Sequence, residues 1–170
     1  PKLLLLDEPL SNLDAALREH MRVELRQLQQ RLGLTTVYVT HDQLEALALS
    51  DVIAVMHDGK IEQLGTPQEI YQKPTSRFIA GFIGSTNWLE GKIMEVGASK
   101  IAEVETKVGI VSSLMAYNGK PGDKVMLSIR PEAIRVETTT PAEGRYVQAR
   151  VESVMFLGEF IDCFLTIGEY

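Results

Sequence analysis

Two acidic residues, Asp7 and Glu8, follow directly after a run of four leucines, Leu3 to Leu6. A continuous apolar run of this length predicts a strand buried on both faces of a parallel sheet. Ligands of open α/β sheets bind outside the carboxyl ends of the strands, where both carboxylates would lie. Adjacent carboxylates there suit phosphoryl transfer, in which one helps to hold Mg²⁺ on a nucleotide and the other orients or deprotonates the attacking water. Taken alone, however, two acids at a strand end are more often simple caps or solvated charges.

A histidine, His41, ends a second strand-like segment, "TTVYVTH", which begins at Thr35 and is rich in β-branched residues. An imidazole at a strand end can donate a hydrogen bond to a phosphate oxygen and stabilise charge that develops during transfer. A lone histidine in this position is usually a surface or packing residue. The carboxylates expected on a neighbouring strand favour a function for His41, whereas His20 and His57 have no such neighbours in the pattern.

The elements that must position these residues alternate between strands and helices. An apolar stripe with helical spacing predicts an amphipathic helix with its stripe in the core, formed by Leu17, Met21, Leu25, Leu28 and Leu32. Asp14 is placed to cap the start of this helix and Gly33 to end it. Further along, Asp58-Gly59 predicts a hairpin turn, "TPQE" (residues 66–69) predicts a capping box, and residues 77–84 predict a short helix.

From about Asn87 the pattern changes to short strand-like runs separated by turn residues, among them "WLEGKIMEV", "AIRVE" and "YVQARVESVMFLG". Such a pattern predicts a small β-barrel or sandwich. We therefore place a domain boundary near residues 85–87, with an α/β domain over residues 1–86 and an all-β domain over residues 87–170.

Composition limits the possible partners. The net charge of −6 is spread evenly over both halves of the chain, so neither half has the basic excess that a nucleic-acid binder needs. A single cysteine, Cys163, fits a reducing cytosol. No signal peptide and no apolar run of membrane-spanning length occurs in the sequence, so a membrane role would depend on a partner.

Taken in order, the motifs resemble those of ABC-transporter ATPases. "LLLLDEP" resembles the Walker B strand, and "SNLD" (Ser11 to Asp14) resembles the D-loop that meets the opposite subunit. "VYVTHD" (Val37 to Asp42) resembles the switch strand. Each motif alone is modest, but the three together, with a gap of roughly thirty residues between the first and the last, are specific to that family.

The resemblance implies a role for each of five residues. Glu8 would be the catalytic glutamate and His41 the histidine that contacts the γ-phosphate. Asp7 would bind Mg²⁺ through water, and the nucleotide site of ATP and Mg²⁺ would also involve Ser11 and Asp14 of the D-loop.

The resemblance extends over essentially the whole chain. The segment from "EALALSD" to "FIAGFIGS" is similar to the end of the ATPase domain in importers of the maltose, polyamine and iron type, and "SIRPEAIRV" and "VMFLGEF" resemble their TOBE domain. The implied fold class is α/β: the C-terminal part of a P-loop ATPase domain, followed by an all-β OB-like (TOBE) barrel.

The resemblance also implies partners, a location and a substrate class. The partners would be a second copy of the ATPase subunit, transmembrane permease subunits and a solute-binding protein, with no nucleic acid. The protein would lie in the cytoplasm, peripherally on the inner face of the cell membrane. The junction "FIGSTNWLEGKI" favours polyamine or iron(III) import over sugar import.

Several motifs of the family do not occur in this sequence. The phosphate-binding pattern G-x-x-x-x-G-K-[ST] is absent, as are the LSGGQ-type signature and the Q-loop. Because these precede the Walker B strand in the family, we expect the chain to be the C-terminal part of a longer ATPase, with a truncated barrel and no activity alone. We also expect Leu3–Leu6 to pair with another chain, rearrange or fray, since a cut sheet exposes unpaired strands.

Two alternatives remain open at this point. The chain could be a non-catalytic regulatory or dimerisation module with a ligand-sensing barrel, since a fold alone does not establish a function. It could also resemble a DNA-repair or other non-transport ATPase, against which the acidic balance and the resemblance to a TOBE domain weigh.

Overall fold

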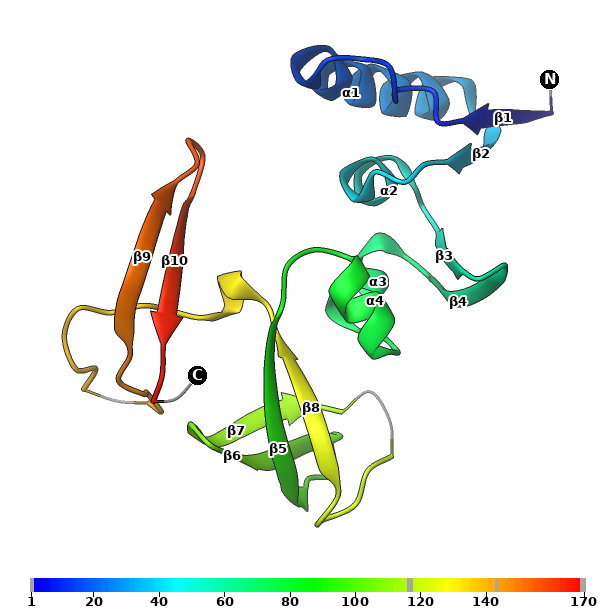
Figure 1. The fold of residues 1–170 in the computed structure, drawn as a ribbon. Coiled ribbons are helices and arrows are strands. Elements are labelled where there is room, and N and C mark those ends of the chain that lie inside the picture. Colours follow the sequence, from blue (N-terminus) through cyan, green and yellow to red (C-terminus); the bar gives the residue numbers. More distant parts are fainter. Residues whose placement is uncertain (1, 116–117, 143, 169–170) are drawn as a thin grey trace. The chain divides into compact units, whose positions relative to one another are not determined.

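The computed structural model describes residues 2–115, 118–142 and 144–168, and the chain divides into two compact units, Pro1–Thr86 and Asn87–Tyr170 (Figure 1). Helices and strands alternate in the first unit. The described part of the second unit consists mainly of strands. The structure is therefore of mixed α/β class with a β-rich C-terminal region.

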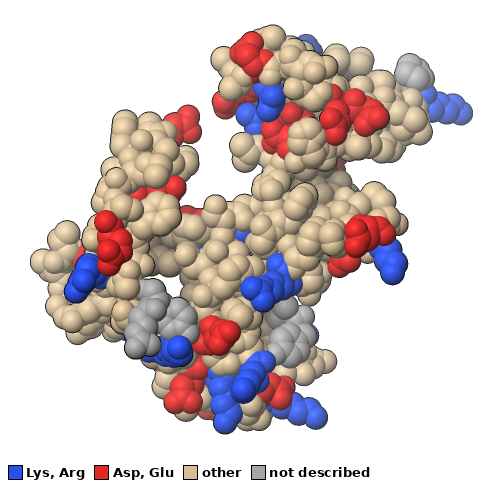
Figure 2. All heavy atoms as spheres, viewed as in Figure 1, with Lys and Arg blue, Asp and Glu red and all other residues tan. Residues whose placement is uncertain are grey.

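The surface of the described residues carries both signs of charge. Figure 2 shows acidic and basic side chains interspersed over the face that it displays. Among the described residues, no helix is both long enough and apolar enough to cross a lipid bilayer.

The first unit begins with a parallel strand pair connected by a long helix. Strand β1 (Leu3–Asp7) pairs with β2 (Thr35–Val39), and α1 (Ala15–Leu32) connects them. As predicted, Asp14 caps α1 by accepting a hydrogen bond from a backbone N–H of the first turn, and Gly33 ends the helix in the left-handed conformation with φ of 59°. All five residues of β1 pair with β2, which occupies one edge of the strand. Pairing of Leu3–Leu6 with another chain, rearrangement or fraying stays a prediction.

The prediction that β1 is buried on both faces is wrong. Exposure alternates along the strand, and Leu5 is 69% exposed while Leu4 and Leu6 are half-buried. On the adjacent strand β2, Val37 and Val39 are about half exposed on the same face as Leu5. A sheet of two strands can be covered on one face and remain open on the other, which the apolar composition of the run does not reveal.

The predicted core position of the α1 stripe is also wrong. None of the residues of α1, all of which the structure describes, is buried, and Leu17, Leu28 and Leu32 are each more than 40% exposed. Part of the stripe lines an open cavity of about 800 Å³ together with Leu4 and Leu6. The helix is amphipathic, but the described elements do not fill the space beside its apolar face.

The remainder of the first unit contains the predicted hairpin and the two predicted short helices. It consists of α2 (Gln43–Leu49), β3 (Ile53–His57), β4 (Lys60–Gly65), α3 (Pro67–Gln72) and α4 (Arg77–Phe82). The β3–β4 hairpin turns at Asp58 and Gly59, which have φ angles of 48° and 75°. Thr66 and Glu69 form the predicted capping box of α3.

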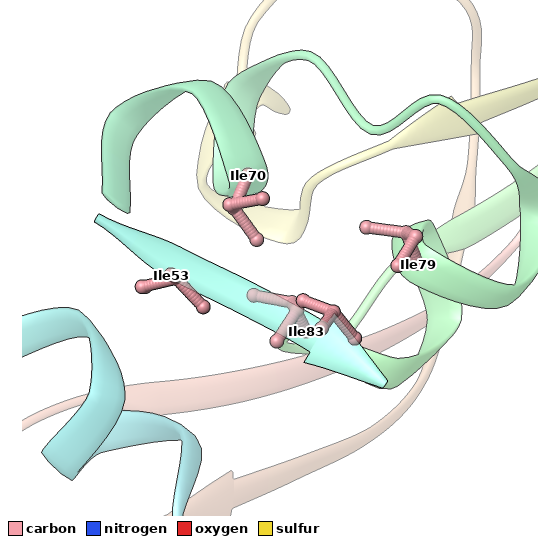
Figure 3. Close-up of a cluster of buried hydrophobic side chains, with 5 residues drawn as sticks. Ile53, Ile70, Ile79 and Ile83 are labelled. Atoms are coloured by element: carbon pink, nitrogen blue, oxygen red, sulfur yellow. The ribbon is translucent and has the colours of Figure 1, made fainter. Parts of the chain in front are cut away.

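The core of this unit is a cluster of β-branched side chains from β3, α3 and the α4 region (Figure 3). Ile70 and Ile79 have no exposed surface, and Ile53, Val55 and Ile83 are at most 7% exposed. Burying such side chains contributes about 1.5–3 kcal/mol each, so this cluster holds the hairpin and the two short helices together.

The second unit contains two separate antiparallel sheets among its described residues. The first has the strand order β7-β6-β5-β8 and consists of β5 (Asn87–Val96), β6 (Ile101–Thr106), β7 (Gly109–Leu114) and β8 (Lys124–Ile129). The second is formed by β9 (Arg150–Phe156) and β10 (Ile161–Thr166). The core of the four-stranded sheet consists of Leu89, Ile93, Ala102, Val104 and Leu127.

Two details of the second unit differ from the sequence predictions. The described strands do not close into a barrel. The segment "AIRVE" does not form a strand, because a short 3₁₀ helix, Pro131–Ala133, turns the chain there. Pro131 fixes φ near the helical value and cannot donate a backbone hydrogen bond to a neighbouring strand. The strand predicted from the β-branched residues that follow it therefore does not form.

Candidate functional site

The parallel register of β1 and β2 brings the chemically interesting residues to one edge. Asp7 lies opposite Val39, and the backbone N–H of Glu8 donates to the carbonyl of Val39 at 2.8 Å, which extends the ladder by one residue. Glu8 has a φ of 44°, in the left-handed region that residues with a Cβ seldom adopt. The Ser11 hydroxyl and backbone N–H both donate to the Glu8 carbonyl, at 2.9 and 3.2 Å. These bonds stabilise a sharp turn that directs the chain away from the sheet directly after the two carboxylates.

Glu8 and His41 form a hydrogen-bonded pair at this edge. The Nδ1 atom of His41 lies 2.9 Å from Oε1 of Glu8, and the two side chains are 75% and 44% exposed. The hydrogen bond from Glu8, followed by its negative charge, raises the pKa of His41 above its ordinary value of 6.5. With Nδ1 directed at Glu8, Nε2 is the ring nitrogen that can bind a further partner.

A small cavity of about 30 Å³ lies beside this pair. It is lined by Glu8, Ser11, Arg18, Thr40, His41, Asp42 and Glu45. The structure therefore brings together three of the five predicted site residues, Glu8, Ser11 and His41. Asp7 is exposed at the end of β1 and does not line this cavity, and the side chain of Asp14 is occupied in capping α1.

Four of the lining residues were not predicted to be part of a site. Arg18 donates to the Leu13 carbonyl at 2.9 Å and lies 3.5 Å from the Asp42 carboxylate. Asp42 in turn caps α2 by accepting from the backbone N–H groups of Leu44 and Glu45. An Asp directly before a helix is a recognisable cap signal, so Asp42 could have been found, whereas Arg18 gives no signal because arginines occur regularly on helix surfaces.

The acidic side chains at this edge fit a Mg²⁺ ion that is held jointly with a bound nucleotide, but not one held by protein side chains alone. No group of three or more His, Cys, Asp or Glu side chains suited to a metal ion occurs among the described residues. Mg²⁺ in phosphoryl-transfer sites needs no such cage, since it binds through one or two carboxylates together with waters and substrate phosphates. The exposed carboxylate of Asp7 at the strand end meets that requirement.

Comparison with known proteins defines the class of this chain. Residues 127–169 match the family model of the TOBE domain. The chain is 47% identical to the spermidine/putrescine import ATP-binding protein PotA of Pseudomonas aeruginosa UCBPP-PA14, with 94% of this chain and 44% of that protein covered. It is 45% identical to PotA of Trichormus variabilis, with 95% and 43% covered, and 46% identical to the Fe(3+) ions import ATP-binding protein FbpC of Brucella melitensis, with 95% and 44% covered.

The chain is thus a homologue of the ATP-binding proteins of ABC importers and contains a TOBE domain in its C-terminal part. It spans less than half the length of these curated relatives. The matched relatives are named for polyamine import and for iron(III) import.

Proposed function

We propose that residues 1–86 take part in ATP hydrolysis by an ABC importer, with Glu8 as general base and His41 as the contact to the γ-phosphate. The observation that supports this best is the 2.9 Å hydrogen bond between the two side chains at the carboxyl edge of a parallel strand pair. In open α/β sheets this edge is where ligands bind.

The two side chains divide the chemistry between them. The Glu8 carboxylate orients the attacking water and accepts its proton, a contribution of about 10²–10⁴-fold in rate. Its hydrogen bond to Nδ1 holds the His41 ring and raises the pKa of His41. In the protonated ring both nitrogens carry a proton, so Nε2 donates to a phosphate oxygen on which negative charge develops during transfer. Because the same carboxylate serves both roles, a change at Glu8 affects the base and the orientation of His41 together.

The other predicted residues contribute around this pair. Asp7 would hold Mg²⁺ through water, and when bound the ion would neutralise phosphate charge. Ser11 and Asp14 would meet a second copy of the subunit through the segment that precedes α1. Ser11 also stabilises the turn at Glu8, so this segment connects the subunit contact to the base.

In this proposal the protein drives solute import through partners. These are a second ATPase subunit, transmembrane permease subunits and a solute-binding protein, and the location is the cytoplasmic face of the cell membrane. The solute is a polyamine or iron(III), as the names of the matched relatives suggest. The C-terminal unit would complete an OB-like TOBE barrel, which the family match over residues 127–169 supports.

A chimera tests the proposal without requiring that this chain act alone. In the chimera, the residues of this chain replace the 161-residue segment of P. aeruginosa PotA with which they align. The rest of that ATP-binding protein is retained to supply the G-x-x-x-x-G-K-[ST] pattern that does not occur in this sequence. We expect Mg²⁺-dependent ATP hydrolysis by the chimera and uptake of spermidine in cells that lack their own PotA. ATP hydrolysis without spermidine uptake would support the proposed ATPase activity and contradict the proposal that the solute is a polyamine.

Two pairs of variants assign the residues in that chimera. Glu8→Gln should lower kcat by about 10²–10⁴-fold while ATP binding survives, whereas Glu62→Gln, the same change on an exposed strand residue, should not. His41→Ala should also lower kcat steeply, and His20→Ala on the exposed surface of α1 should not. Unchanged hydrolysis in Glu8→Gln would remove Glu8 from the role of base.

A second candidate is a non-catalytic regulatory or dimerisation module. A chimera that folds and binds ATP but does not hydrolyse it would favour this candidate.

A further inference from the structure

Glu45 is a buried acidic residue that the proposed mechanism does not use. It lies in the first turn of α2, four residues after His41, and is only 2% exposed. A buried carboxyl group is costly unless it is hydrogen-bonded. Here Oε2 of Glu45 accepts two bonds of 2.8 Å, one from the Tyr38 hydroxyl and one from the Thr40 hydroxyl. Burial and the bond to Glu45 also raise the pKa of Tyr38 well above its ordinary value.

Comparison with Glu69 shows that Glu45 does more than stabilise a helix end. Both are the third residue of a helix, the position from which a glutamate closes a capping box. Glu69 is exposed and does so, accepting from the backbone N–H of Thr66 at 2.9 Å. Glu45 is directed to the preceding strand instead, and the N–H of its cap residue, Asp42, is bound by the Thr40 hydroxyl at 2.9 Å.

The hydroxyl of Thr40 therefore connects Glu45 to both sides of His41. It accepts from the Asp42 N–H, so its own proton is directed to the Glu45 carboxyl group. Asp42 is held a second time because its carboxylate accepts from the first turn of α2. Both neighbours of His41 are thus fixed by hydrogen bonds. The His41 side chain itself is 75% exposed, and among the described residues its one hydrogen bond is to Glu8.

We propose that Glu45 is a positioning residue that, through the Thr40 hydroxyl, holds the strand-to-helix turn so that Nδ1 of His41 faces Glu8. The consequence for ATP hydrolysis rests on the proposed function, whereas the positioning is a property of this chain and is measurable without nucleotide. Catalytic groups misplaced by about 1 Å lose rate by as much as about 10²-fold, so a buried anchor at this turn has a direct effect on a reaction that uses His41.

Nitrogen NMR of the 170-residue chain tests the positioning. At a pH where the imidazoles are neutral, long-range ¹H–¹⁵N spectra show which nitrogen of each ring carries the proton. The chain has three histidines, and His41→Gln assigns the signals of interest. We expect the His41 proton on Nδ1 in the parent chain, since Glu8 accepts there.

Variants of Thr40 separate positioning from folding and charge. Thr40→Val keeps the shape of the side chain and the Glu45 carboxyl group, so the fold should survive, but His41 should lose its preference for Nδ1–H. Thr40→Ser restores the hydroxyl and should restore the preference. Glu45→Ala should act like Thr40→Val, and the matched control Glu69→Ala, at the same helix position in α3, should leave His41 unchanged. Retention of Nδ1–H in both Thr40→Val and Glu45→Ala would overturn the proposal.

The chimera tests the consequence for catalysis. Thr40→Val should lower kcat by about 10-fold to 100-fold with little change in KM, and Thr40→Ser should recover it. If the parent chimera does not hydrolyse ATP, the proposed function fails, while the NMR result still decides the positioning. If the chimera is active and Thr40→Val has the parent kcat, the catalytic part of the inference is wrong.

Discussion

The cluster around Ile70 and Ile79 and the β1–β2 strand pair are both built from aliphatic residues, yet only the cluster forms a closed core. Ile70 and Ile79 have no exposed surface, whereas Leu5 in β1 is 69% exposed. The cluster is buried because a hairpin strand and two short helices within residues 53–83 meet there, and partly buried side chains that include Ala46 and Leu47 of α2 pack against it. The strand pair is covered on one face only. Glu8 and His41 lie at the end of this open strand pair, and their side chains are 44% and 75% exposed.

The largest effect should come from truncating the cluster. Ile79→Ala should lower the free energy of unfolding by about 2–5 kcal/mol, because it leaves a cavity that the surrounding short helices cannot fill. Leu5→Ala, the matched change on the open face of β1, should stay within about 0.5 kcal/mol. Urea unfolding followed by circular dichroism measures both. Equal losses in the two variants would mean that the face of β1 is buried in solution and that the comparison fails.

A smaller effect should follow from removing a helix cap beside the cluster. Thr66→Ala removes the hydroxyl that accepts from the Glu69 N–H and should cost about 0.5–2 kcal/mol. Two other bonds, donated to the Glu69 carboxylate by the backbone N–H and by the hydroxyl of Thr66, hold the pKa of the Glu69 carboxyl group below its usual range, and the variant removes the second of them. The variant should therefore also raise that pKa, which a carbon-detected NMR titration measures. An unchanged Glu69 pKa would contradict the bond from the Thr66 hydroxyl to the Glu69 carboxylate.

The smallest effect on stability should come from the exposed pair at the site. Since Glu8 raises the pKa of His41 above 6.5, the pair stabilises the fold fully below pH 6.5 and loses this contribution as the pH rises through the folded-state pKa. Glu8→Gln should lower the His41 pKa towards 6.5. A proton NMR titration of the three imidazoles measures this, with His20 as the internal control. A His41 pKa that does not change would show that the pair does not form in solution.

Local signals predicted much of the fold because the interactions involved are short in sequence. The cap at Asp14, the turn at Asp58-Gly59 and the capping box at Thr66 each depend on a few adjacent residues, and the structure confirms all three. Burial of β1 and of the α1 stripe was predicted wrongly, because burial depends on which distant elements cover a face. The pattern of apolar residues does not contain that information.

Some residues of the candidate site were likewise predicted from the sequence, and others were found only in the structure. Asp7, Glu8 and His41 were predicted from residue type at strand ends, and the parallel register places the last two within hydrogen-bonding distance. Arg18 and Glu45 were missed. A glutamate three residues after a cap indicates a capping box in any sequence, and only the buried contacts of Glu45 with Tyr38 and Thr40 distinguish it from Glu69.

The sequence by itself therefore determined the class of the chain, the order of the elements of the first unit and the residue types that can do chemistry at the ends of β1 and β2. Tertiary structure alone decided which faces are covered and which side chains pair, including the contact of His41 with Glu8 and the burial of Glu45. The physical reason is that caps and turns are satisfied by neighbours along the chain, whereas burial and long-range hydrogen bonds depend on segments that only folding brings together.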